Sequence, residues 1–122
     1  MNAPNRKIKE ISDKIVKEYQ PEKIILFGSH AWGEPHEWSD VDLLVVKESN
    51  KSKLERTREL RGLLSNSGQP LDVLVYTRGE LEALINQGRN LFLEDIVRNG
   101  VILYTQPSYD ITLTHEPAML IT

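Results

Sequence analysis

The sequence predicts an α/β fold of the mixed α+β kind, in which helices flank a small mixed sheet of three to four strands. Two observations lead to this prediction. Short apolar runs, typical of strands buried on both faces, alternate along the chain with segments that have the period of amphipathic helices. In addition, a helix of ordinary length separates the apolar runs at 41–46 and 71–76, which is the crossover expected between parallel neighbouring strands.

The N-terminal part is expected to form a helix and two strands. The helix is predicted over 5–19, where isoleucines recur at helical spacing and lysines cover the other side. Nearly continuous apolar runs predict strands over 23–27 and 41–46. Between these strands, 28–34 should form a turn and a short helix that stops near Pro35.

The middle of the chain contains two capping boxes, in which Ser52 and Thr77 each precede a glutamate by three residues. They predict helices over 52–66 and from 77 to about 86, on either side of a strand over 71–76. The apolar face of the first of these helices is predicted to comprise Leu54, Leu60, Leu63 and Leu64.

The C-terminal part is predicted to add a helix over 90–98 and a short strand over 101–104. The apolar residues of that helix are Leu91, Phe92, Ile96 and Val97. Residues 106–122 show no clear period and mix prolines with apolar side chains. We therefore expect one domain over 1–105 and a C-terminal tail over 106–122, whose apolar residues are candidates for binding a partner.

Length and composition restrict the function. A chain of 122 residues suits a single domain, and its formal net charge of -3 gives no overall attraction to nucleic acids or anionic membranes. No stretch is long and apolar enough for a membrane span, and none resembles a signal peptide. The absence of cysteine excludes disulfides, thiolate zinc sites and cysteine nucleophiles. Together these features favour a cytoplasmic protein without a strong nucleic-acid or membrane signal.

A pair of alternate carboxylates opens the second predicted strand. Asp40 and Asp42 are two residues apart and therefore point to the same side of a strand. Two such charges about 4 Å apart repel by roughly 4 kcal/mol at an effective dielectric near 20. A divalent cation offsets this repulsion, and Mg²⁺ in particular binds one or two carboxylates together with substrate phosphates.

A glycine-serine turn and a third aspartate are expected at the same edge of the sheet. Asp72 follows the start of the third strand as Asp42 follows the start of the second, and parallel strands start at one edge. The turn at Gly28 and Ser29 follows the end of the first strand, so it reaches that edge if the first strand is antiparallel to the second. Its backbone amides and the serine hydroxyl are suited to holding phosphates.

Together these residues resemble the nucleotidyltransferase superfold typified by DNA polymerase β. The matching pattern is Gly28-Ser29, Gly33, Asp40-Val41-Asp42 and, on a later strand, Asp72. Within that superfold, the chain resembles the minimal nucleotidyltransferases of prokaryotes, and the match covers most of the chain from Ile8 to Tyr104 in element order. The pattern is fairly specific, because the turn, the aspartate pair and the third aspartate occur together at workable spacing.

The resemblance implies nucleotidyl transfer and a role for each of these residues. Asp40, Asp42 and Asp72 would bind two Mg²⁺ ions, and Asp72 would also help to deprotonate the attacking hydroxyl. The donor implied is a nucleoside triphosphate, with ATP as the expected nucleotide. The residues expected to contact that nucleotide are Gly28, Ser29 and Ser39. For Ser39, a local turn role is the alternative.

The resemblance also implies a partner protein. Minimal nucleotidyltransferases are often encoded beside a helical protein of the HEPN class (higher eukaryote and prokaryote nucleotide-binding), with which this chain would form a hetero-oligomer. The acceptor would lie on that toxin, and this chain would act as the antitoxin. Two alternatives stay open: a catalytically weak antitoxin that neutralises its partner by binding, and an enzyme that modifies a small molecule such as an antibiotic.

Other residues near the motif have more ordinary interpretations. The histidines are widely separated, which argues against a histidine zinc site. Trp32 could stack on a nucleobase, but packing of the short helix against the sheet is the favoured role. It is also a departure from the family pattern, because minimal members usually carry a basic residue there. The basic residues of 47–61 are interpreted as a solvated helix face rather than an RNA groove.

Overall fold

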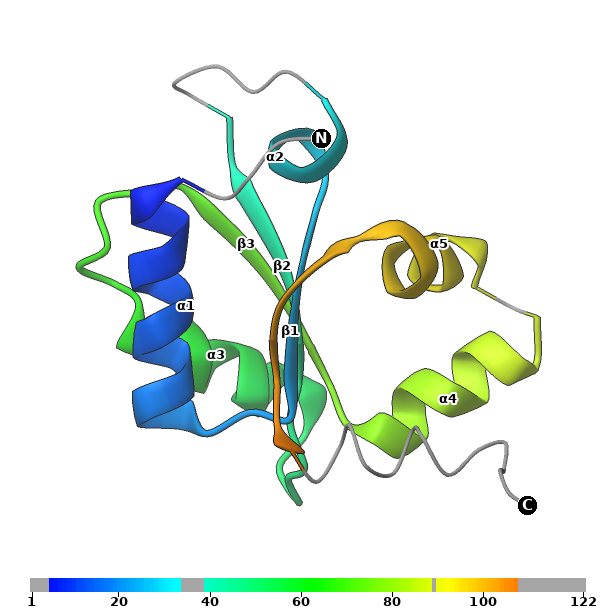
Figure 1. Ribbon diagram of the computed structural model, residues 1–122. Helices are drawn as coiled ribbons and strands as arrows, with labels where there is room; N and C mark the ends of the chain where they lie inside the picture. Colours follow the sequence, from blue (N-terminus) through cyan, green and yellow to red (C-terminus); the bar gives the residue numbers. More distant parts are fainter. Residues whose placement is uncertain (1–4, 34–38, 89, 108–122) are drawn as a thin grey trace.

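The computed structural model describes residues 5–33, 39–88 and 90–107. The strands are β1 (Lys23–Phe27), β2 (Val41–Val46), β3 (Leu71–Tyr76) and β4 (Val101–Thr105). The helices are α1 (Arg6–Tyr19), α2 (Ser29–Trp32), α3 (Lys53–Leu63), α4 (Arg78–Asn86) and α5 (Leu91–Asn99). In Figure 1, α1 and α3 cover one face of the sheet, and α4 and α5 lie on the other.

The sheet is mixed, as predicted, and has the strand order β3-β2-β1-β4. β1 is antiparallel to both of its neighbours, β2 and β4, whereas β2 and β3 are parallel and are connected through α3. The predicted boundaries of β1, β2 and β3 are confirmed, and β4 continues one residue further than predicted, to Thr105. The mixed α+β fold predicted from the apolar runs is therefore confirmed.

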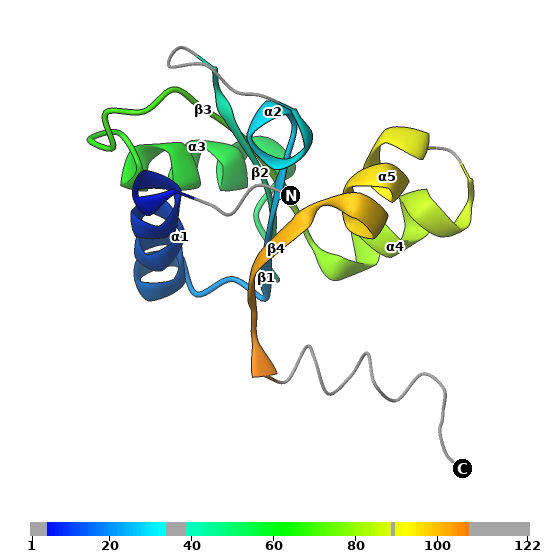
Figure 2. The same cartoon turned by 45° about the horizontal axis from the view of Figure 1, so that its top comes forward.

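Alternation along the strands divides the core into two layers. In β2, Leu43 and Val45 pack toward α1 and α3, while Leu44 and Val46 pack toward α4 and α5. Both faces are covered, which explains why the strands read as nearly continuous apolar runs. The turned view in Figure 2 shows the same arrangement of helices. Since Asp42 alternates with Leu43, it belongs to the face on which α4 and α5 lie.

The predicted caps of α3 and α4 are confirmed, and so are the predicted ends of α1 at residue 19 and of α4 at about residue 86. The capping boxes at Ser52 and Thr77 are both present. α3 nevertheless ends at Leu63 rather than at residue 66. The reason is local: the residues after Leu63 form short turns with hydrogen bonds to the third preceding residue, and these lead into Gly68, whose φ is +73°.

The predicted apolar face of α3 is partly wrong. Leu54 is 59% exposed, whereas Arg56, interpreted from the sequence as solvated, is only 1% exposed. Arg56, Leu60 and Leu64 are four residues apart and share one side of the helix, and Leu54 lies nearly opposite Arg56. The inward side of α3 therefore carries an arginine in its first turn.

Some predictions fall on segments outside the described residues. They include the end of the short helix near Pro35 and the C-terminal tail beyond residue 107. The predicted division into a domain over 1–105 and a tail thus stays an expectation. Within the described ranges, no helix is both long enough and apolar enough to cross a membrane.

Candidate active site

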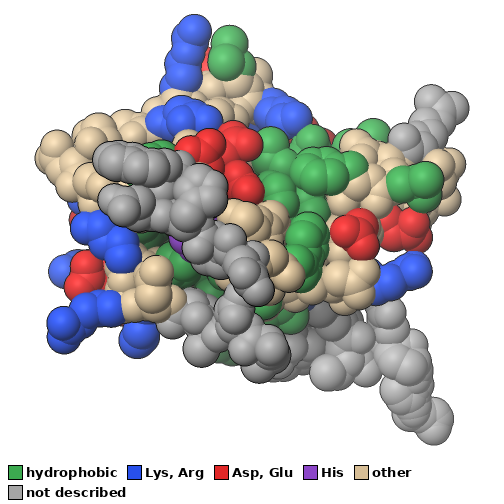
Figure 3. Space-filling model, turned by 90° about the horizontal axis from the view of Figure 1, so that it is seen from above, with side chains coloured by type: hydrophobic (Ala, Val, Ile, Leu, Met, Phe, Trp, Pro, Cys, Tyr) green, Lys and Arg blue, Asp and Glu red, His purple; other side chains and the backbone are tan. Residues whose placement is uncertain are grey.

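The predicted carboxylates lie at one edge of the sheet. Asp42 of β2 and Asp72 of β3 are directly opposite each other in the parallel register, and Asp40 comes two residues before Asp42. Figure 3 looks down on this end of the molecule and shows acidic side chains gathered in one patch. The prediction that the aspartates from neighbouring parallel strands share an edge is confirmed.

The glycine-serine turn reaches the same edge because β1 is antiparallel to β2. Phe27, the last residue of β1, is paired with Asp42. Gly28 follows with φ +77° and ψ −156°, a conformation that is essentially restricted to glycine. A Cβ atom at Gly28 would overlap Oδ2 of Asp42. The missing side chain therefore allows the backbone of the turn to lie directly against the Asp42 carboxylate.

The turn is held in place by the short helix that follows it. The N–H groups of Ala31 and Trp32 donate to the carbonyl of Gly28, and that of Gly33 donates to the carbonyl of Ser29. Ala31 is buried in the core layer that faces α1 and α3. These contacts fix Gly28 and Ser29 at the edge where the aspartates lie.

The electrostatics of this edge disfavour negative charge on Asp42. Burial, together with the nearby charges of Asp72 and Asp40, raises the pKa of the Asp42 carboxyl above its ordinary value, while His30 acts in the opposite direction. A carboxyl perturbed by burial and by like charges at the edge of a sheet is a candidate functional group. A cation bound here would relieve the repulsion.

The carboxylates fit magnesium as part of a ligand set. Among residues 5–33, 39–88 and 90–107, no three His, Cys, Asp or Glu side chains are grouped closely enough to hold a metal ion by themselves. Asp72 is instead paired with Arg61, whose Nη2 lies 3.5 Å from Oδ1 of Asp72. An all-oxygen donor set suits Mg²⁺, which typically takes one or two carboxylates and completes its shell with water and phosphate oxygens.

Comparison with known proteins identifies the family. Residues 8–103 match the family model described as a nucleotidyltransferase domain. The chain belongs to this family. A crystal structure of a "putative nucleotidyltransferase" from Sulfolobus solfataricus has the same fold, with a TM-score of 0.54 and 21% sequence identity over 85% of this chain and 82% of that one. No curated protein shows significant sequence similarity.

Arg61 is a residue of the nucleotidyltransferase domain whose position sequence reasoning missed. Its basic stretch is interpreted from the sequence as solvated, and the Arg61 side chain is indeed half-exposed, but it also contacts Asp72 and donates from Nη1 to the carbonyl of Leu71 at 3.4 Å. The order and directions of the strands predict the position of Arg61. Because α3 connects two parallel strands, its last turn must return to the edge where β3 begins.

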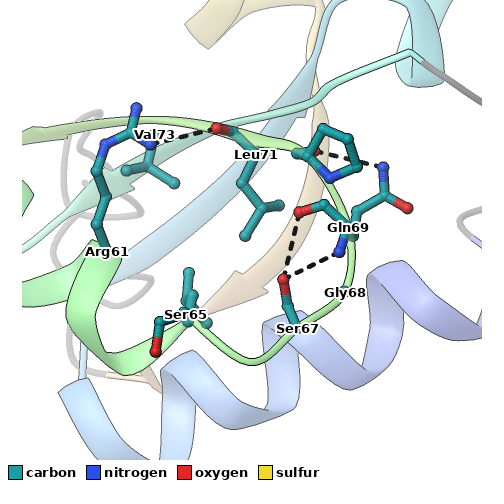
Figure 4. A pocket seen from close by; sticks show the side chains of 9 residues that line it. Arg61, Ser65, Ser67, Gly68, Gln69, Leu71 and Val73 are labelled. Atoms are coloured by element: carbon teal, nitrogen blue, oxygen red, sulfur yellow. Dashed lines mark hydrogen bonds between the residues drawn. The ribbon is translucent and has the colours of Figure 1, made fainter.

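A pocket of about 430 Å³ lies beside Arg61 on the nucleotidyltransferase domain. Figure 4 shows Ser65, Ser67 and Gln69 along the loop that borders it, with Leu71 and Arg61 on the strand and helix sides. The pocket is open and partly polar, and the ion pair between Arg61 and Asp72 connects it to the acidic edge.

Ser39 of the nucleotidyltransferase domain joins this loop to the aspartates. Its carbonyl accepts a hydrogen bond from Nε2 of Gln69 at 3.2 Å and lies 3.3 Å from Nε2 of His30. The residue before Asp40 is thus connected to both α2 and the pocket loop. Its contact with a nucleotide stays a prediction, whereas its part in a local hydrogen-bond network is observed.

The aromatic residue of α2 has a different role from the one predicted. Trp32 is 46% exposed, and Ala31 rather than Trp32 packs the helix against the sheet. The indole Nε1 of Trp32 donates to the carbonyl of Asn99, the last residue of α5, at 2.9 Å. α2 and α5 therefore meet beside the acidic edge.

Proposed function

We propose that this nucleotidyltransferase domain transfers AMP from ATP to an acceptor hydroxyl, with Mg²⁺ as the required cation. The observation that carries the proposal is the contact between Gly28 and Asp42. A turn without a side chain lies against one carboxylate, and a second carboxylate, Asp72, stands opposite in the neighbouring strand. Phosphates and cations can meet at such an edge, and membership of the family supports the transferase class.

The reaction is a substitution at phosphorus. The acceptor oxygen forms a bond to the α-phosphorus, the bond from that phosphorus to the bridging oxygen of the β-phosphate breaks, and pyrophosphate leaves. Bound Mg²⁺ would offset the charge on the attacking and leaving oxygens. The protein has to hold the two reactants in line and to accept the proton of the hydroxyl.

The three aspartates divide these tasks in the proposed mechanism. Asp40 and Asp42 would hold the ions, which would offset the burial and the like charges of Asp72 and Asp40 that raise the pKa of the Asp42 carboxyl. Asp72 would join the second of the two Mg²⁺ ions and take the proton of the acceptor. For that, Asp72 must leave Arg61, and their separation of 3.5 Å between exposed side chains makes this inexpensive.

Gly28 and Ser29 would hold the phosphates. The backbone at Gly28 has no side chain to keep a ligand away, and the Ser29 hydroxyl follows directly at the start of α2. Ser39 would contribute by keeping Asp40 in place through its hydrogen bond with Gln69. In these assignments, the residues of the sequence motif act from the positions that they occupy at the shared edge of the sheet.

We propose a hydroxyl on a helical toxin of the HEPN class as the acceptor, with this chain as its antitoxin in a hetero-oligomer. The resemblance to minimal nucleotidyltransferases supports this choice.

A transfer assay tests the proposal. The chain is incubated with ATP labelled at the α-phosphate, Mg²⁺ and the candidate partner, and protein-bound label is measured. We expect label on the partner with the parent chain, none with Asp42→Asn or with EDTA, and normal transfer with the control Asp13→Asn, whose carboxylate is exposed on α1. Transfer by Asp42→Asn at the parental rate would contradict the site. Neutralisation of the partner without label would instead favour binding alone, and label on free aminoglycosides a small-molecule enzyme.

A further inference from the structure

Two exposed aromatic side chains, Trp32 of α2 and Phe92 of α5, lie near the glycine-serine turn and have no role in the proposed function. We propose that these two rings, Phe92 at the start of α5 and Trp32 hydrogen-bonded to its last residue, make up an aromatic wall, on part of which the nucleobase of the bound nucleotide stacks. This inference rests on the proposed function, because it places the phosphates of the same nucleotide at Gly28. It adds a binding site for the base, which the carboxylates and the turn do not supply.

Phe92 lies close to the turn. Phe92 is 57% exposed, and its ring packs edge-on against the ring of Phe27, with centroids 5.7 Å apart and an interplanar angle of 82°. Phe27 directly precedes Gly28 and is the register partner of Asp42. Directly opposite residues in an antiparallel pair project to the same face. One side chain therefore separates Phe92 from both the turn and the carboxylate.

Trp32 is positioned by a hydrogen bond rather than by burial. It is the last residue of the short helix that begins at Ser29, and its Nε1 donates to the carbonyl of Asn99 at 2.9 Å. The indole has no other polar atom, so its exposed ring surface requires no further polar partner. The bond to Asn99 also holds the ring in place before a ligand arrives, which lowers the entropic cost of binding.

The chemistry of the surroundings favours a nucleobase as the occupant. Figure 3 shows hydrophobic side chains directly beside the acidic patch at this end of the molecule. A ligand that fits both must have a flat, neutral, weakly polar part joined to a group that recruits cations, and a nucleoside triphosphate has both. Because stacking depends on ring overlap rather than on hydrogen bonding, we expect purine nucleotides to bind more tightly than pyrimidine nucleotides, with little discrimination between adenine and guanine.

Binding measurements with and without a base test the inference. Calorimetric titrations with Mg²⁺ and a non-hydrolysable ATP analogue are compared with titrations with Mg²⁺ and tripolyphosphate, which has neither base nor sugar. We expect Phe92→Leu, which keeps an apolar contact with Phe27, to weaken binding of the analogue by about fivefold to 100-fold. Tripolyphosphate binding should change less than about twofold. The control Leu54→Ala, which removes a side chain 59% exposed on α3, should change neither affinity.

The possible outcomes separate this inference from the proposed function. If Phe92→Leu and Trp32→Leu both leave the ratio of the two affinities unchanged, the aromatic wall does not bind the base and the inference is overturned, while the proposed function stands. The inference is also overturned if these variants impair only binding of a protein partner. If the parent chain binds neither ligand in the presence of Mg²⁺, the proposed function fails and the inference fails with it.

Discussion

At the scale of single residues, the arrangement of the acidic edge of the sheet depends on Gly28, which has no side chain. Gly28 has φ +77°, and the position that its Cβ would take is occupied by the carboxylate of Asp42. Both features require glycine, and they have different consequences. The backbone conformation concerns stability, whereas the close approach concerns the position of a carboxylate that can rotate away.

Replacing Gly28 by alanine should therefore harm activity more than stability. Backbone strain of this kind costs about 1–3 kcal/mol, and the new methyl group would displace the Asp42 carboxylate. We expect Gly28→Ala to lower the free energy of unfolding in urea by about that amount and to abolish transfer from labelled ATP.

Gly79→Ala is the matched control, because a Cβ there meets nothing within 4 Å and Gly79 lies in the first turn of α4. It should leave transfer unchanged and raise the free energy of unfolding by up to about 1 kcal/mol. Full activity of Gly28→Ala would show that the turn and Asp42 do not have to touch.

Asp42 should destabilise the protein in the absence of a cation. Its pKa is raised in the folded state by burial and by the neighbouring aspartates, so the native state holds this proton more tightly than the unfolded state does. Stability then falls as pH rises from the unfolded value, near 3.8, through the higher folded value. At pH 7 without Mg²⁺, we expect Asp42→Asn to have a higher Tm than the parent chain, and the difference should vanish below the unfolded value.

Adding Mg²⁺ with a non-hydrolysable ATP analogue should reverse the order of the two Tm values, so that the parent chain unfolds at a higher temperature than Asp42→Asn. The parent chain gains stability from binding, whereas Asp42→Asn does not. A lower Tm for Asp42→Asn at pH 7 without Mg²⁺ would mean that the carboxylate stabilises the fold, and would contradict the assignment.

At the scale of elements, an ion pair between the buried Arg56 and the half-exposed Glu80 connects α3 with α4. Nη2 of Arg56 is 2.8 Å and 3.0 Å from the two carboxylate oxygens of Glu80, and Glu80 also completes the capping box of α4 through Thr77. Partial burial tends to raise the pKa of Glu80, but the hydrogen bonds from Thr77 and Arg56 outweigh it and lower the pKa below 4.5.

Replacing Glu80 should lower the free energy of unfolding more than replacing Arg56. Glu80→Gln keeps a capping-box side chain but leaves the buried Arg56 charge unpaired, so it should cost about 1–3 kcal/mol of unfolding free energy at pH 7. Arg56→Met removes the charge and keeps much of the volume, and should cost less than about 1 kcal/mol.

The pH dependence of the stability lost in Glu80→Gln tests whether charge pairing with Arg56 is its cause. Because the folded pKa of Glu80 is lowered, its contribution is present above the unfolded value and is lost as pH falls through the folded value. In urea unfolding, the deficit of Glu80→Gln should shrink at acidic pH. A deficit larger for Arg56→Met than for Glu80→Gln would show that packing, not charge pairing, dominates.

The same elements show what the sequence could predict. The strand boundaries followed from apolar runs covered on both faces, and the starts of α3 and α4 followed from Ser52 and Thr77. The burial of Arg56 could not be read in this way, because it depends on Glu80, which lies in another helix, and buried arginines are rare without such a partner.

At the scale of the whole molecule, topology assembles the candidate site. An antiparallel β1 brings its following turn to the edge where the parallel strands β2 and β3 begin, and the crossover helix α3 returns Arg61 to that edge. The shared edge was predictable from the directions of the strands, because parallel strands start at one edge and an antiparallel first strand ends there. The pairing of Asp72 with Arg61 and the meeting of α2 with α5 were not, because they depend on side-chain packing between distant segments.

The most direct measurement is a crystal structure of the chain with Mn²⁺ in place of Mg²⁺ and a non-hydrolysable ATP analogue, with the metal located by its anomalous signal. We expect the metal bound to carboxylate oxygens of Asp40 and Asp42, and the triphosphate against Gly28 and Ser29. A metal or nucleotide bound away from this edge of the sheet would contradict the proposed site.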